Sequence, residues 1–128
     1  GRDNNFYDLI PYDKDWGEIE LGRDLFTYDF KRTFNRVITN PPYRDNKPEG
    51  ERKNICMNFI FRCLELCDDE CWLLLNYRMW NSLTPVRLNK IREMGFNLSF
   101  LRIIAIKKWY GRYYWCCFKK NGKSIIEF

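Results

Sequence analysis

A β-branched run that stops at two consecutive prolines constrains this chain most. The run covers residues 34–39, and Asn40-Pro41-Pro42 follows it directly. β-Branched and aromatic residues favour strands, and a proline lacks the backbone N–H that a strand ladder needs. The sequence therefore predicts a strand over residues 34–39 whose carboxyl end presents Asn40 at a fixed place.

Strand and helix patterns alternate along much of the chain. Apolar residues at three-and-four spacing predict a helix over residues 53–67, and a continuous apolar run predicts a buried strand over residues 71–77. Thr84, Pro85 and Gly95 are typical of the cap, first position and end of a further helix. The other predicted segments are a short strand at 6–13, a short strand or turn at 19–26, a loop at 44–52, strands at 98–106 and 113–118, a turn at 121–122 and a brief return pairing at 125–126.

The order of these segments predicts one α/β domain over residues 1–128. Alternating strands and helices favour a parallel sheet. The last two strands are joined by the short loop 107–112, so they are expected to be antiparallel. The prediction is a mostly parallel sheet with an antiparallel strand near one edge.

Charge is distributed unevenly along the chain. The formal net charge is +5, residues 1–30 are rich in Asp and Glu, and the C-terminal quarter is basic. The basic residues of that quarter are Arg102, Lys107, Lys108, Arg112, Lys119, Lys120 and Lys123. Such a cluster is either a solvated face or a surface for nucleic acid.

Cysteine and histidine usage excludes several kinds of site. The chain has six Cys and no His, so His-dependent acid–base chemistry is excluded. Cys63, Cys67 and Cys71 are spaced by fours, which matches neither zinc nor iron–sulfur patterns, so no metal site is predicted. Buried free thiols fit a reducing compartment, cytoplasmic or nuclear. No apolar run has the length of a membrane span.

The tetrapeptide Asn40-Pro41-Pro42-Tyr43 lies where ligands bind in open α/β sheets, outside the carboxyl end of a strand. The Asn40 side-chain oxygen and the Pro41 carbonyl can both accept hydrogen bonds from a planar amino group, and the Tyr43 ring can stack on it. The tetrapeptide resembles motif IV of S-adenosylmethionine-dependent amino-methyltransferases, which include adenine-N6 methyltransferases of DNA and RNA and glutamine methyltransferases. The resemblance implies a Rossmann-like methyltransferase sheet and an enzyme in which these four residues are catalytic.

Further segments extend the resemblance. Asp24 and Leu25 match the family's motif III beside the cofactor adenine, and Asp13, with Asp15 as a rival, matches the acid that binds the cofactor ribose. The strand at 71–77 matches the family's fifth strand, and the last two strands match its final hairpin. The resemblance implies S-adenosylmethionine as cofactor and nucleic acid, DNA before RNA, as partner. The implied substrate-binding residues are Tyr43, Trp109, Tyr110, Tyr113, Lys107, Lys108 and Arg112.

The sequence departs from the family at the cofactor loop. It contains no Gly-x-Gly, and the pattern begins at the family's second strand, so the first strand and the glycine-rich loop are lacking. The expectation is a fragment of a longer enzyme, or one piece of it completed by an upstream segment or a second chain. Two alternatives remain open: a catalytically inactive relative that binds nucleic acid or a partner subunit, and a protein glutamine methyltransferase.

Overall fold

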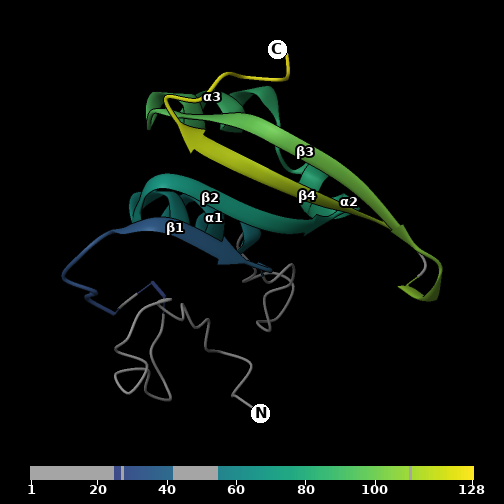
Figure 1. The fold of residues 1–128 in the computed structure, drawn as a ribbon, viewed down its shortest axis with the longest axis horizontal. Helices are drawn as coiled ribbons and strands as arrows, with labels where there is room; N and C mark the ends of the chain where they lie inside the picture. Colours follow the sequence, from purple (N-terminus) through teal and green to yellow (C-terminus); the bar gives the residue numbers. More distant parts are fainter. Residues whose placement is uncertain (1–24, 27, 42–54, 110) are drawn as a thin grey trace, which may run out of the picture.

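The computed structural model describes residues 25–26, 28–41, 55–109 and 111–128, which fold around one mixed sheet (Figure 1). The predicted strand at 6–13 and the loop at 44–52 lie outside these residues, as do residues 19–24 of the strand or turn predicted at 19–26, whose residues 25–26 form a turn. The elements are β1 (Phe34–Thr39), α1 (Ile55–Glu65), β2 (Cys67–Asn76), α2 (Tyr77–Asn81), α3 (Pro85–Glu93), β3 (Phe96–Ile106), the short 3-10 helix η3 (Lys107–Trp109) and β4 (Gly111–Lys120).

The sheet has four strands in the order β1-β2-β4-β3. β1 pairs parallel with β2, and β4 runs antiparallel to both β2 and β3. Three strands therefore share one direction, and β4, next to the edge strand β3, is reversed. The predicted α/β class and the antiparallel pairing of the last two strands are confirmed. The sheet is mixed rather than mostly parallel as predicted, because one strand pair is parallel and two are antiparallel.

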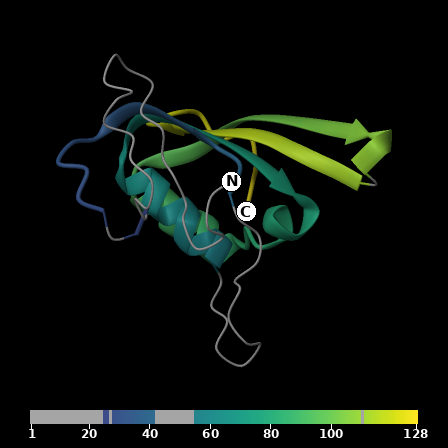
Figure 2. The same cartoon turned by 90° about the horizontal axis from the view of Figure 1, so that it is seen from below.

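The helices lie on one side of the sheet, as Figure 2 shows. β-Strands point alternate side chains to opposite faces, so every second residue of β2 and β4 meets the helices. We call this side the helix face, and its buried strand residues include Cys71, Leu73, Leu75, Cys116 and Phe118. They pack with the apolar side of α1, formed by Cys56, Phe59, Ile60, Cys63 and Leu64. The spacing of these α1 residues places them on one helical stripe.

The other side of the sheet carries no helix within the described part of the chain, and we call it the open face. Its apolar residues are Ile38, Trp72, Leu74, Phe100, Ile104, Tyr113, Trp115 and Cys117. Three of them, Ile38, Trp72 and Phe100, occupy one row with Cys117 across all four strands, because Ile38 is opposite Trp72, and Cys117 is opposite both Trp72 and Phe100. The open face is therefore apolar in its middle.

Local signals fixed the ends of α3 as predicted. The Thr84 hydroxyl oxygen accepts a hydrogen bond from the Arg87 N–H at 3.4 Å, and Pro85 is the first helical residue. Gly95 follows the helix with a φ of +94°, a conformation that glycine adopts without steric cost. The predicted turn at 121–122 is also present, with Asn121 at a φ of +56°.

The boundary between α1 and β2 differs from the prediction. The helix ends at Glu65 rather than at residue 67, and Cys67 already belongs to β2, so Cys63 and Cys67 do not share a helix face. The acidic residues that follow extend the strand, since Glu70 forms ion pairs with Arg36 at 2.9 Å and with Lys119 at 3.3 Å. Cross-strand cations thus make strand pairing favourable for an acidic segment.

Three smaller differences concern segment ends. Tyr77 begins α2 instead of ending the strand, and part of the predicted loop 107–112 is η3 followed by the start of β4. β3 begins at Phe96. The expected return pairing at 125–126 is a single backbone hydrogen bond, from the Ile125 N–H to the Leu98 carbonyl at 2.9 Å, rather than a strand.

Candidate functional site

The carboxyl ends of β1 and β2 meet at one edge of the sheet because the two strands are parallel. Thr39, the last residue of β1, pairs with Leu73, and β2 continues to Asn76. Asn40 follows β1 directly, so it stands at the edge where α/β sheets bind their ligands. We call this edge the carboxyl edge.

The first half of the predicted motif combines an exposed amide with a buried proline. Asn40 is exposed, whereas the Pro41 side chain is fully buried. Within the described ranges, no residue hydrogen-bonds the Asn40 side chain. A buried proline fixes the direction of the chain, so Asn40 is held at its place while its amide oxygen remains open to an incoming donor. Pro42 and Tyr43 lie outside the described residues.

A second asparagine at the carboxyl edge has a structural role. The Asn76 Oδ1 atom accepts a hydrogen bond from the Met79 N–H at 2.9 Å and so caps α2. α2 is further held by Trp80, whose ring stacks on Tyr114 of β4 at a centroid distance of 5.0 Å and an interplanar angle of 5°. Asn40, with its exposed amide, is therefore the better candidate of the two for binding a ligand.

The segment before β1 is attached to α1. The Leu25 side chain is fully buried in the core. Its carbonyl accepts a hydrogen bond from the Arg62 Nε–H at 2.9 Å, and the Tyr28 carbonyl accepts one from Arg62 Nη2 at 3.2 Å. Any contact of Leu25 with a cofactor would therefore come from its backbone. The other two predicted cofactor residues, Asp13 and Asp24, lie outside the described residues, as does Asp15.

The predicted substrate-binding residues cluster at the turn between β3 and β4. Lys107 and Lys108 lie in η3 and are exposed, and so is Arg112 of β4. Tyr113 is half-buried and pairs with Asn76, which places it at the carboxyl edge. Trp109 belongs to η3 by its backbone, and Tyr110 lies outside the described residues. The structure thus joins Tyr113 to the carboxyl edge and puts the three cations farther out along β3 and β4.

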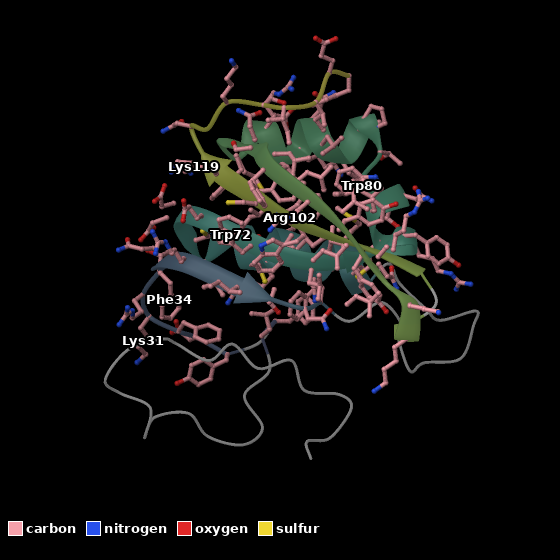
Figure 3. All side chains as sticks on the ribbon, turned by 45° about the vertical axis from the view of Figure 1, so that its right-hand side comes forward. Lys31, Phe34, Trp72, Trp80, Arg102 and Lys119 are labelled. Carbon is pink, nitrogen blue, oxygen red and sulfur yellow. The ribbon has the colours of Figure 1, made fainter. Side chains whose placement is uncertain are left out.

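The aromatic residues of the open face were not identified from the sequence. Trp72 stacks on Trp115 with a centroid distance of 5.3 Å and an interplanar angle of 26°, and Trp72 also contacts Phe100 at 5.4 Å. In Figure 3, Trp72 and Arg102 lie on the side of the strands away from the helices. The alternation of side chains within residues 71–77 could have identified Trp72, because it places Trp72 and Leu74 on one face of the strand and Leu73 on the other.

The cysteines do not form a reactive or metal-binding centre. All six are buried free thiols, as predicted. Burial raises the pKa of Cys56 and of Cys116 to about 12, so neither is a thiolate at neutral pH. The described part of the chain holds no group of three or more metal-ligating side chains, and none of its helices is long and apolar enough to cross a membrane.

No protein-family model, curated protein or solved structure shows a significant match to this chain. The geometry of the carboxyl edge is therefore the basis for assigning a function. That geometry comprises an exposed Asn40 amide and a buried Pro41 after β1, with Tyr113 at the same edge on β4, beyond β2. The Asn40 amide oxygen is a hydrogen-bond acceptor that suits a ligand with an amino group.

Proposed function

We propose that this chain is an S-adenosylmethionine-dependent methyltransferase, or part of one, that methylates the N6 amino group of adenine in nucleic acid, with DNA as the preferred substrate. One observation carries the proposal: Asn40 is exposed at the carboxyl edge and is followed by the buried Pro41. The sequence Asn40-Pro41-Pro42-Tyr43 resembles the amino-methyltransferase motif at this same position, after a sheet strand.

The sheet supports the proposal. The resemblance implies a mostly parallel sheet with an antiparallel strand near one edge. Three strands of this sheet share a direction, and the reversed β4 lies next to the edge strand β3. β1, which precedes the motif, pairs parallel with the apolar β2. A parallel strand pair at the motif and a reversed strand next to one edge support the implied sheet.

The residues of the carboxyl edge would act on the target amino group. The lone pair of an aromatic amine is delocalised, which makes the nitrogen a weak nucleophile. Hydrogen bonds to the Asn40 amide oxygen and the Pro41 carbonyl would hold the nitrogen and favour a tetrahedral geometry that frees the lone pair. Tyr43 would stack on the base, and a base within a duplex would first be flipped out. When bound, S-adenosylmethionine supplies the electrophilic methyl group.

Methyl transfer from labelled S-adenosylmethionine to an adenine-containing oligonucleotide tests the proposal. We expect transfer by the longest native form of the protein and a loss of about 100-fold or more in its Asn40→Ala variant, because misplacing a reacting group costs a factor of this order. Asn35→Ala is the matched control, since Asn35 is an exposed asparagine of the same strand. Equal activity in both variants would contradict the role of Asn40.

A second candidate function is nucleic-acid binding without catalysis. It is favoured by the absence of a Gly-x-Gly pattern from the sequence, since the family uses a glycine-rich loop to hold the cofactor. Calorimetry with S-adenosylmethionine separates the two functions. Cofactor binding with methyl transfer supports the enzyme, whereas oligonucleotide binding without either supports the inactive relative. Transfer to a glutamine-containing release-factor peptide, but not to adenine, would instead identify a protein methyltransferase.

A further inference from the structure

The end of the β3–β4 hairpin is a two-stranded ribbon that extends beyond the rest of the sheet. β2 pairs with β4 only as far as the partners Asn76 and Tyr113. Beyond them, β4 pairs with β3 alone, and η3 leads toward the turn. Figures 1 and 2 both show this end projecting away from the sheet and the helices. We call residues 105–109, 111 and 112 the arm.

All charged residues of the arm are basic. Residues 94–126 contain no Asp or Glu, so the charge of the whole hairpin is positive. Three cations lie on the arm, namely Lys107, Lys108 and Arg112, and Arg102 lies at its base, opposite Trp115; all four are exposed. Among the residues that the structure describes, no carboxylate forms an ion pair with any of them.

The cations at the other end of the same hairpin are used within the protein. Lys119 forms ion pairs with Glu70 at 3.3 Å and with Asp69 at 3.9 Å. Lys120 donates a hydrogen bond from Nζ to the Met94 carbonyl at 3.0 Å. The cations of the arm make no such contact with the residues described.

The arm cations and Arg102 at the base point in several directions around the hairpin. Arg102 is opposite Trp115, so it lies on the open face, whereas Arg112 is opposite Ala105 and lies on the other face. Lys107 and Lys108 occupy the tip, in η3. A flat anionic surface would meet only one of these directions. Two anionic walls on either side of the ribbon would meet all of them.

We infer that the arm enters a groove of double-stranded nucleic acid. The major groove of B-form DNA is about 12 Å wide and admits a two-stranded β-ribbon between two phosphate backbones. Arg112 on the arm and Arg102 at its base would then face opposite walls, and the two lysines at the tip would lie deepest in the groove. This inference rests on the proposed nucleic-acid substrate and assigns the duplex as its form. A single strand has one phosphate backbone, which would contact the cations on only one face of the hairpin.

Fluorescence anisotropy with a labelled DNA duplex and the same labelled single strand, without cofactor, tests the inference. We expect the duplex to bind more tightly than the single strand. The slope of log affinity against log salt concentration should become shallower by about 2 in the double variant Lys107→Ala/Lys108→Ala, because each lost phosphate contact contributes about 0.9. The matched control is Lys90→Ala/Lys123→Ala, which removes two exposed lysines outside the arm.

Three outcomes would overturn the inference: tighter binding to the single strand, equal slopes in the two double variants, or no binding to either oligonucleotide. The result is independent of catalysis, because no cofactor is present. Methyl transfer could fail while the arm still binds the duplex. Conversely, methylation of a glutamine-containing peptide without duplex binding would keep the methyltransferase function and remove the role of the arm.

Discussion

The two faces of the sheet are built from the same strands but differ in how completely they are buried. On the helix face, Leu73, Leu75 and Phe118 are inaccessible to solvent. On the open face, Ile38 is 65% exposed and Phe100 is 40% exposed. Neighbouring residues of one strand thus belong to two different environments, and the helices decide which residue belongs to which.

Aromatic contacts and ion pairs stabilise the open face, where burial is incomplete. Trp72 contacts both Trp115 and Phe100, and Cys117, which lies on β4 between Trp72 and Phe100, is only 3% exposed. Next to this row, Glu70 joins Arg36 and Lys119 in a cross-strand charge network. The helix face is therefore stabilised by complete burial, whereas the open face depends on contacts within a single layer of side chains.

The largest expected effect is on the helix face. Phe118→Ala should lower the free energy of unfolding by about 3–5 kcal/mol, because it removes a fully buried ring and leaves a cavity. Urea denaturation followed by circular dichroism measures this loss. Phe118→Leu is the conservative control, and it should retain most of the stability. A loss below about 1 kcal/mol for Phe118→Ala would mean that the helix face is not the main core.

A smaller loss is expected on the open face. Trp72→Ala removes the contacts with Trp115 and Phe100, and we expect it to cost about 1–3 kcal/mol, since the ring is only partly buried and aromatic pairs add a modest term. Trp72→Phe keeps one ring in the row and should cost less. If Trp72→Ala were as destabilising as Phe118→Ala in the same urea titration, the comparison between the faces would fail.

Thiol labelling gives a local measure of the same difference. Burial, followed by the nearby charge of Glu70, raises the pKa of Cys117 to about 11, so this thiol should react slowly in the native protein. Trp72→Ala should uncover Cys117 and speed its reaction with iodoacetamide. Cys116, on the helix face, should be unaffected. Mass spectrometry identifies the labelled residue, and equal acceleration at both positions would indicate general unfolding instead.

The parts of the fold that the sequence predicted correctly are those determined by neighbouring residues. β1 begins and ends as predicted, because a β-branched run and a proline are local signals. The cap at Thr84 and the stop at Gly95 also depend on a few adjacent residues. The position of Asn40 at the carboxyl edge followed from β1 being parallel to its neighbour.

The parts that were missed depend on residues far away in the chain. Cys67 and the acidic residues after it form a strand because Glu70 meets Arg36 and Lys119 from two other strands. The alternation within residues 71–77 separates the two faces of β2, but which face stays open depends on the side of the sheet on which the helices pack. Half of the candidate site, with Pro42 and Tyr43, lies outside the described residues and stays a prediction.

The smallest expected effect concerns the charge network of the open face. Although partial burial of Glu70 opposes its ionisation, hydrogen bonds from Trp72 and Lys119 and the charges of Lys119 and Arg36 lower its pKa overall. A lowered pKa in the folded state stabilises the protein above the unfolded-state pKa of about 4.3, and this stabilisation is lost as the pH falls through the folded-state pKa.

Glu70→Gln should therefore be less stable than wild type at pH 7, and the gap should close below about pH 4. We expect a gap under about 1 kcal/mol, since partly exposed ion pairs contribute little. Glu93→Gln is the control, because Glu93 is exposed on α3 and makes no ion pair with the residues described. Urea titrations at several pH values measure the gap. A gap that stays constant with pH would show that the network does not stabilise the open face.

Phe118→Leu should leave the pH dependence unchanged, because the buried side chains of the helix face include no carboxylate among the residues described.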